Sequence, residues 1–144
     1  MIETGDMDKY FRTYQKYYSI SGIIVDGNKI GRTIGFPTAN ILPDQNVQIP
    51  LIGVYAVYVR IMDQLHKGML NIGVRPTFNL SEITLEVHLF DFDQLVYNQQ
   101  ISVYFVARVR DEIKFESKEL LIQQLQSDKN SIIEILKISQ APKE

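Results

Sequence analysis

Apolar residues recur at strand-like spacing through the middle of the chain. Residues 83–90 and 101–109 alternate apolar and polar positions, and residues 20–25, 53–61 and 68–73 are rich in β-branched or aromatic residues. Such runs are typical of strands. They follow one another closely, with no helical pattern before Ser117. The pattern therefore predicts an antiparallel barrel or sandwich rather than alternating strands and helices.

Polar connections separate these predicted strands. Residues 63–67 are expected to form a turn after the strand at 53–61, which leaves 68–73 as a short strand. Residues 91–100 are expected to form a polar loop.

Helical patterns are confined to the two ends of the chain. Asp6 is placed to cap a helix that begins at Met7 and ends near Tyr14. Residues 1–17 are therefore interpreted as a linker or an appended helix, followed by one domain over residues 18–144.

Ser117 is placed to cap a second helix, whose apolar face would pack on the strands. Glu119 would lie in the positive first turn of this helix. The polar residues 127–131 are expected to interrupt it before an apolar run resumes at 132–136.

Composition narrows the class of protein. The chain has 144 residues, of which 45% are hydrophobic, and this suits one folded domain. No apolar run is long enough to cross a bilayer, and a net charge of −2 does not favour a broad nucleic-acid surface. The N-terminal residues lack a secretory pattern, so a cytoplasmic protein is expected.

Metal chemistry is restricted in the same way. The chain has no cysteine and two histidines, which excludes disulfides and thiolate zinc sites and disfavours a histidine-rich metal site. A bound metal is therefore expected to be Mg²⁺ or a similar ion with oxygen ligands.

The decapeptide GRTIGFPTAN at residues 31–40 combines two glycines, a cation and a proline. Thr38 and Asn40 offer oxygen atoms two residues apart, on one side of the chain if the segment is extended. Such a loop suits a phosphate with a divalent cation. It matches neither the P-loop nor the dinucleotide fingerprint. A tight hairpin connection, with Thr38 and Asn40 bonded to turn amides, is an equally good interpretation of these ten residues.

Glu86 and His88 are the second candidate pair. In a strand they share the face opposite Leu85, Val87 and Leu89. That face is either exposed to solvent, which the pattern alone favours, or directed into a cleft. In a cleft, the Glu86 carboxylate is a candidate general base with a neighbouring imidazole.

Two further clusters carry candidate ligand contacts. Arg75 follows a predicted strand and could meet phosphate or simply be solvated. Arg110 and Phe115 lie between the last predicted strand and the C-terminal helix. Phe115 could stack on an aromatic ligand or close the end of the barrel.

Taken together, these segments resemble the riboflavin kinase family from about residue 18 to residue 135. The resemblance rests on motifs in one order: SGIIVDG at 21–27, GRTIGFPTAN at 31–40, GVY at 53–55, NIGVRPTF at 71–78, LEVHLFDF at 85–92 and RDEIKFES at 110–117.

The resemblance implies a mainly β fold. A six-stranded antiparallel closed barrel of Greek-key type would carry a C-terminal helix packed on it and a short N-terminal linker helix. It also implies transfer of the ATP γ-phosphoryl group to the 5′-hydroxyl of riboflavin, giving FMN and ADP. Mg²⁺, with Mn²⁺ or Zn²⁺ as substitutes, is the implied cofactor.

Roles at the site are implied residue by residue. Glu86 falls on the family's base, and Thr38 and Asn40 fall on its Mg²⁺ and phosphate ligands. The remaining implied nucleotide contacts are Gly27, Arg32, Leu89, Asp91 and Tyr97. The implied flavin contacts are Arg110, Ile113 and Phe115.

One segment departs from the family pattern. Val96-Tyr97-Asn98 stands where the family usually has Leu-Tyr-Gly. Asparagine tolerates left-handed backbone better than most residues, so the turn can be kept.

Residues 3–9 resemble the linker that precedes the kinase module of bacterial bifunctional FAD synthetases. The chain is expected to be the kinase half of such a protein, with an adenylyltransferase module upstream, and not to make FAD by itself. A non-catalytic flavin- or nucleotide-binding barrel and a flavin-dependent reductase are the alternative functions.

Overall fold

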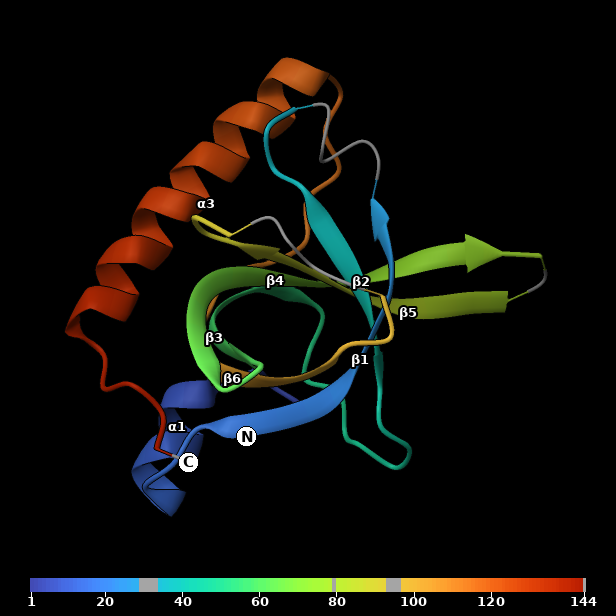
Figure 1. Cartoon of the computed structure of the whole chain (residues 1–144). Coiled ribbons are helices and arrows are strands. Elements are labelled where there is room, and N and C mark those ends of the chain that lie inside the picture. Colours follow the sequence, from blue (N-terminus) through green and yellow to red (C-terminus); the bar gives the residue numbers. More distant parts are fainter. Residues whose placement is uncertain (29–33, 79, 93–96, 144) are drawn as a thin grey trace.

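The computed structural model describes residues 1–28, 34–78, 80–92 and 97–143. Its helices and strands follow one another in the order shown in Figure 1. They are α1 (Met7–Tyr14), β1 (Tyr18–Asn28), β2 (Thr38–Pro43), β3 (Gly53–Ile61), β4 (Gln64–Thr77), β5 (Leu80–Leu89), β6 (Gln100–Arg110) and α3 (Lys118–Ile138).

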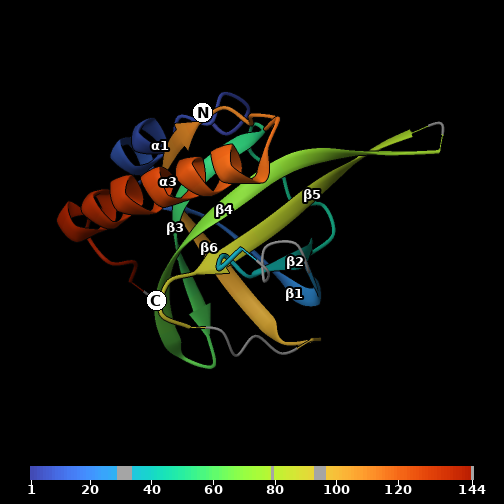
Figure 2. The same cartoon turned by 90° about the horizontal axis from the view of Figure 1, so that it is seen from above.

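The strands form a closed six-stranded barrel in the order β1-β2-β5-β4-β3-β6, with antiparallel pairing throughout. The predicted barrel is confirmed, and the sandwich alternative is excluded because the sheet closes on itself. The hairpin of β4 and β5 projects well beyond the barrel, while α3 runs along the barrel's outer wall (Figures 1 and 2).

Two separate apolar clusters pack the barrel interior and join the barrel wall to α3. The first fills the barrel and includes Tyr55, Leu70 and Phe105, each with no exposed surface. The second lies between the barrel wall and α3 and includes Ile132 and Leu136 of the helix. Strands β3, β4 and β6 therefore contribute residues to both clusters, because successive side chains of a strand point to opposite faces.

The N-terminal helix forms as predicted. The Asp6 side chain accepts a hydrogen bond of 3.0 Å from the backbone N–H of Lys9, and the helix ends at Tyr14. Met7, the first helical residue, is 1% exposed and belongs to the cluster inside the barrel. The first turn of α1 therefore packs on the barrel interior.

The C-terminal helix differs from the prediction. It is continuous from Lys118 to Ile138, so the expected interruption at 127–131 is wrong. Within that segment, Asp128 is buried and pairs with Arg110 of β6. A tertiary ion pair thus stabilises helix where local composition favours a break.

Strand β4 also differs, because it begins at Gln64 rather than Gly68. The expected turn over 63–67 is instead a tight turn at Met62 and Asp63, whose φ angles are 49° and 64°. Lys67 and Gln64 pair in register with Tyr58 and Ile61 of β3. Pairing with β3 therefore extends the strand through a polar segment.

None of the helices in the described part of the chain has the length and apolar character to cross a membrane.

Candidate active site

The barrel's register places several predicted site residues in one row across its outer face. Asn40 of β2 lies opposite Glu86 of β5, and Glu86 lies opposite Asn71 of β4. Asn71 in turn lies opposite Val54, which lies opposite Arg110 of β6. On β2, β4 and β5, neighbours of these residues such as Ile41, Ile72 and Val87 belong to the cluster inside the barrel. The row thus crosses five strands, and its members on β3, β4, β5 and β6 line one cavity together with residues of α3.

A cavity of about 200 Å³ lies in this layer. Five predicted site residues line it: Thr38, Glu86, Arg110, Ile113 and Phe115. The rest of its lining is largely apolar and includes Leu121 and Leu125 of α3. Glu86 and His88 therefore face a cleft rather than open solvent, the alternative that the alternation alone did not favour.

Thr38 and Glu86 meet at the wall of this cavity. The Thr38 hydroxyl donates to the Glu86 carboxylate across 3.4 Å between Oγ1 and Oε2. A hydroxyl that donates its proton to a carboxylate keeps its lone pairs for a cation. The Asn40 amide nitrogen donates to the Asp26 carboxylate, which makes the Asn40 carbonyl oxygen the atom suited to a cation. These hard oxygens fit a magnesium-like ion.

The donor set also limits how a cation can be held. Across the described ranges, no group of three or more histidine and carboxylate side chains is arranged to hold a metal ion. Mg²⁺ commonly takes few protein ligands and completes its shell with waters and substrate phosphates. Thr38 and Asn40, as two candidate ligands, suit a site of this kind, in which few protein atoms contact the ion.

His88 fixes the segment that leads into β2. Its side chain is 7% exposed, and its Nδ1–H donates to the backbone carbonyl of Pro37 across 2.7 Å. Burial lowers the pKa of His88, with the hydrogen bond to Pro37 opposing and the nearby Lys129 cation adding to that effect. A neutral imidazole therefore ties the Pro37–Thr38 segment to β5.

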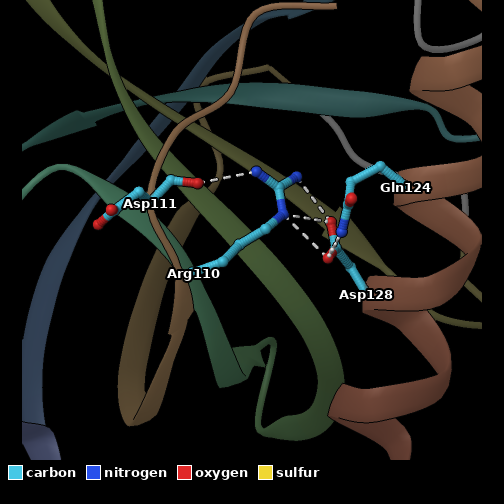
Figure 3. Close-up of polar contacts among 4 residues, drawn as sticks. All are labelled: Arg110, Asp111, Gln124 and Asp128. Carbon is cyan, nitrogen blue, oxygen red and sulfur yellow. Dashed lines mark hydrogen bonds and ion pairs between the residues drawn. The ribbon is translucent and has the colours of Figure 1, made fainter.

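Arg110 lies at the end of β6 against α3 (Figure 3). Its guanidinium pairs with the buried Asp128, with N–O distances from 2.7 to 3.0 Å. The guanidinium carbon lies 5.9 Å from the centre of the Phe115 ring. Phe115 lines the cavity outside the barrel, so it does not close the barrel end.

The riboflavin kinase family model matches residues 14–136, most of the chain. This chain belongs to the riboflavin kinase family. It is 49% identical over 114 residues to a bifunctional riboflavin kinase/FMN adenylyltransferase of Haemophilus influenzae, covering 78% of this chain and 37% of that protein. It is 38% identical over 135 residues to the Bacillus subtilis protein of the same description, covering 92% of this chain and 43% of that protein.

A solved structure supports the same fold. A crystal structure described as a macrolide-efflux protein from Streptococcus pneumoniae has a TM-score of 0.85 and 36% identity, covering 91% of this chain and 43% of that one. The chain spans about two fifths of the length of the curated relatives cited above. Family membership implies an ATP co-substrate and a divalent metal.

Four nucleotide contacts implied by the riboflavin kinase resemblance, Gly27, Leu89, Asp91 and Tyr97, do not line this cavity. Leu89 is buried inside the barrel, so its side chain is committed to the core. Gly27 pairs with Ala39 between β1 and β2. Asp91 and Tyr97 are exposed. Arg32 lies outside the described residues, as does Val96. These nucleotide contacts stay predictions.

The turn at Asn98 keeps the geometry that its glycine-like position requires. Asn98 has a φ of 65°, and its backbone N–H donates to the Ile24 carbonyl across 2.7 Å. Asparagine therefore adopts the left-handed backbone expected at this departure from the riboflavin kinase pattern.

Sequence reasoning missed two polar residues at the site. Asp128 shares the buried stripe of α3 with Ile132 and Leu136, so an acid at apolar spacing was the available signal. Asn71 lines the cavity, and its buried Oδ1 has no hydrogen-bond partner among the described residues. Its position opposite Glu86 could have been found only from the register of β4 and β5.

Proposed function

We propose that this chain transfers the terminal phosphoryl group of ATP to the 5′-hydroxyl of riboflavin, giving FMN and ADP. One observation carries the proposal: Thr38, a candidate cation ligand, lies beside Glu86, a candidate base, in a cavity that Phe115 and Arg110 also line. Family membership supplies the substrate class.

Glu86 is proposed as the general base. Its carboxylate would orient the ribityl 5′-hydroxyl and accept the proton as that oxygen bonds to the γ-phosphorus and the bond to the ADP oxygen breaks. Phosphoryl transfer depends mainly on positioning and charge stabilisation, so the fixed register of Glu86 on β5 suits this role.

Thr38 and Asn40 are proposed to hold the divalent cation, which we infer to be Mg²⁺, with Mn²⁺ or Zn²⁺ as substitutes. When bound, such an ion neutralises charge on the nucleotide phosphates. Because both side chains belong to β2, the barrel fixes their spacing from each other and from Glu86.

Phe115, Ile113 and Arg110 are proposed to bind the flavin ring. The cavity's apolar lining suits a planar aromatic group. Gly27, Arg32, Leu89, Asp91 and Tyr97 are retained as proposed nucleotide contacts. We further propose that an adenylyltransferase module accompanies this chain in a longer protein, because its relatives are bifunctional and more than twice as long as the part they share with it.

The test compares Glu86→Gln with Glu82→Gln, a control on the same strand and the same face, far out on the hairpin. FMN and ADP would be quantified with and without Mg²⁺, and riboflavin binding would be followed by its fluorescence. Glu86→Gln is expected to lower turnover by roughly 10²–10⁴-fold while binding persists, because a general base typically contributes that much.

The two possible failures differ in meaning. Near-normal turnover in Glu86→Gln would remove Glu86 from the role of base. Riboflavin binding by the unmodified chain without any ADP formation would replace the kinase proposal with the non-catalytic binding module.

A further inference from the structure

The Arg110 guanidinium is held on more than one side. Nε and Nη2 donate to the two carboxylate oxygens of Asp128, and Nη1 donates to the backbone carbonyl of Asp111 across 3.0 Å (Figure 3). Gln124, one turn earlier on α3, donates its amide N–H to Asp128 Oδ1 across 2.9 Å. The orientation of Arg110 is therefore set from α3.

This pair is buried rather than superficial. The side chains of Arg110 and Asp128 are 15% and 3% exposed. A buried ion pair stabilises a structure only when its geometry is good and its remaining polar atoms are bonded. The side-on, two-nitrogen contact and the Gln124 amide meet both conditions. Loss of the Asp128 charge would leave the Arg110 cation without its buried partner.

The pair joins two walls of the cavity. Arg110 and Phe115 come from the end of β6 and the segment that follows it, whereas Leu121 and Leu125 come from α3. Asp128 lies on the same helix as the two leucines and bonds to the arginine across this gap. One wall is therefore tied to the other by a pair in which Arg110 lines the cavity and Asp128 does not.

The contact also determines what Arg110 offers to a ligand. Arginine has five N–H donors, and the contacts to Asp128 and Asp111 use three of the five. Asp128 occupies the edge formed by Nε and Nη2, which leaves N–H groups on the Nη1 and Nη2 edge. The carbonyl oxygens of a planar ring are acceptors to which these N–H groups can donate.

We propose that Asp128, supported by Gln124, is a positioning residue that sets the affinity of the cavity for the riboflavin ring by orienting Arg110. The inference rests on the proposed function, because it takes riboflavin as the ligand. Asp128 belongs to α3 and is absent from the lining of the cavity that Thr38 and Glu86 share, so it is proposed to act on ring binding through Arg110 and not on phosphoryl transfer.

The test uses Asp128→Asn, which keeps the side chain's shape and removes its charge. The Kd for riboflavin, measured by fluorescence without nucleotide, and its KM are expected to rise at least roughly tenfold, about 1.4 kcal/mol. The KM for ATP and kcat are expected to stay within about twofold, because uniform loss of ring binding raises KM alone. Gln124→Ala should give a smaller shift in the same direction.

Two comparisons separate positioning from a general effect on stability. Glu134→Gln breaks an exposed pair with Lys137 on the same helix and should leave the riboflavin Kd unchanged. In an Arg110→Met background, which also leaves no unpaired cation if Asp128→Asn alone folds poorly, Asp128→Asn should no longer change the Kd.

A Kd in Asp128→Asn equal to that of the unmodified chain would overturn the proposal. An equally large change in the Arg110→Met background would also overturn it, because Asp128 would then act independently of Arg110. If the unmodified chain binds riboflavin but forms no FMN, the proposed kinase function fails while the binding comparison still decides the role of Asp128.

Discussion

Alanine substitution of two glycines in β4, Gly73 and Gly68, should have different effects on the structure. A Cβ at Gly73 would lie 2.4 Å from Glu112 Oε1, the end of a flexible side chain on the cavity wall. A Cβ at Gly68 would lie 2.6 Å from the backbone oxygen of His88 in the neighbouring strand. Gly73→Ala should therefore move a side chain, whereas Gly68→Ala should move a strand.

The distances from each added Cβ to its nearest neighbour set the displacement that each substitution requires, and hence its cost in stability. With 3.4 Å as ordinary contact, Glu112 must shift by 1.0 Å (3.4 − 2.4) and the β5 backbone by 0.8 Å (3.4 − 2.6). A displaced rotamer costs about 0.5–1.5 kcal/mol, which is close to the roughly 0.4–1 kcal/mol gained by restricting the unfolded chain. Gly73→Ala should thus be nearly neutral. Separating two packed strands costs about 1–3 kcal/mol.

Thermal unfolding and riboflavin binding together form the assay. Gly68→Ala should lower Tm by several degrees, since about 1 kcal/mol corresponds to roughly 3–4 °C for a chain of this size. Gly73→Ala should leave Tm within about 3 °C and change the riboflavin KM through Glu112. In a Glu112→Ala background the next neighbour is Asn71 Nδ2 at 3.5 Å, so the effect of Gly73→Ala on KM should disappear.

Two results would refute this reasoning. One is a Gly73→Ala protein at least as destabilised as Gly68→Ala, which would mean that Glu112 cannot yield. The other is an effect of Gly73→Ala on KM that persists without the Glu112 carboxylate.

Further predictions concern the cation and the pH dependence. Thr38→Ala should raise the Mg²⁺ concentration for half-maximal rate by roughly tenfold or more, and an unchanged Mg²⁺ titration would count against the assignment of Thr38. Burial lowers the pKa of His88, so the folded chain binds its proton less readily than the unfolded chain, and stability should fall as pH drops below about 6.5. His88→Asn, which retains an N–H donor for Pro37, should reduce the fall in the denaturant midpoint between pH 7 and pH 5. His66→Asn is measured alongside, because burial also lowers the pKa of His66 and this histidine could contribute to the same pH dependence. If the denaturant midpoint of His88→Asn falls with pH as steeply as that of the unmodified chain, His88 is excluded as the source.

Much of the fold could be predicted because its signals are local. Alternation at 83–90 placed Glu86 and His88 on one face, and capping by Asp6 and Ser117 marked where both helices begin. These features depend on residues within a few positions of each other.

The missed features depend on residues distant in sequence. Asp128 keeps α3 continuous because Arg110, 18 residues earlier, pairs with it. Gln64 belongs to β4 because Ile61 of β3 pairs with it across a tight turn. Likewise, whether Glu86 faces solvent or a cavity depends on α3, which begins more than 30 residues later.

Side chains of β5 alternate between the barrel interior and the polar row, and this limits where the chain can gain or lose a residue. Deleting one residue from β5 between Leu85 and Leu89 would turn the barrel's filling outward and the polar row inward, because successive side chains point to opposite faces. Removing one residue from each strand at the tip of the projecting hairpin would leave the register of Glu86 with Asn40 and Asn71 unchanged. Insertions and deletions should therefore be tolerated at the hairpin tip and not in the wall of the barrel.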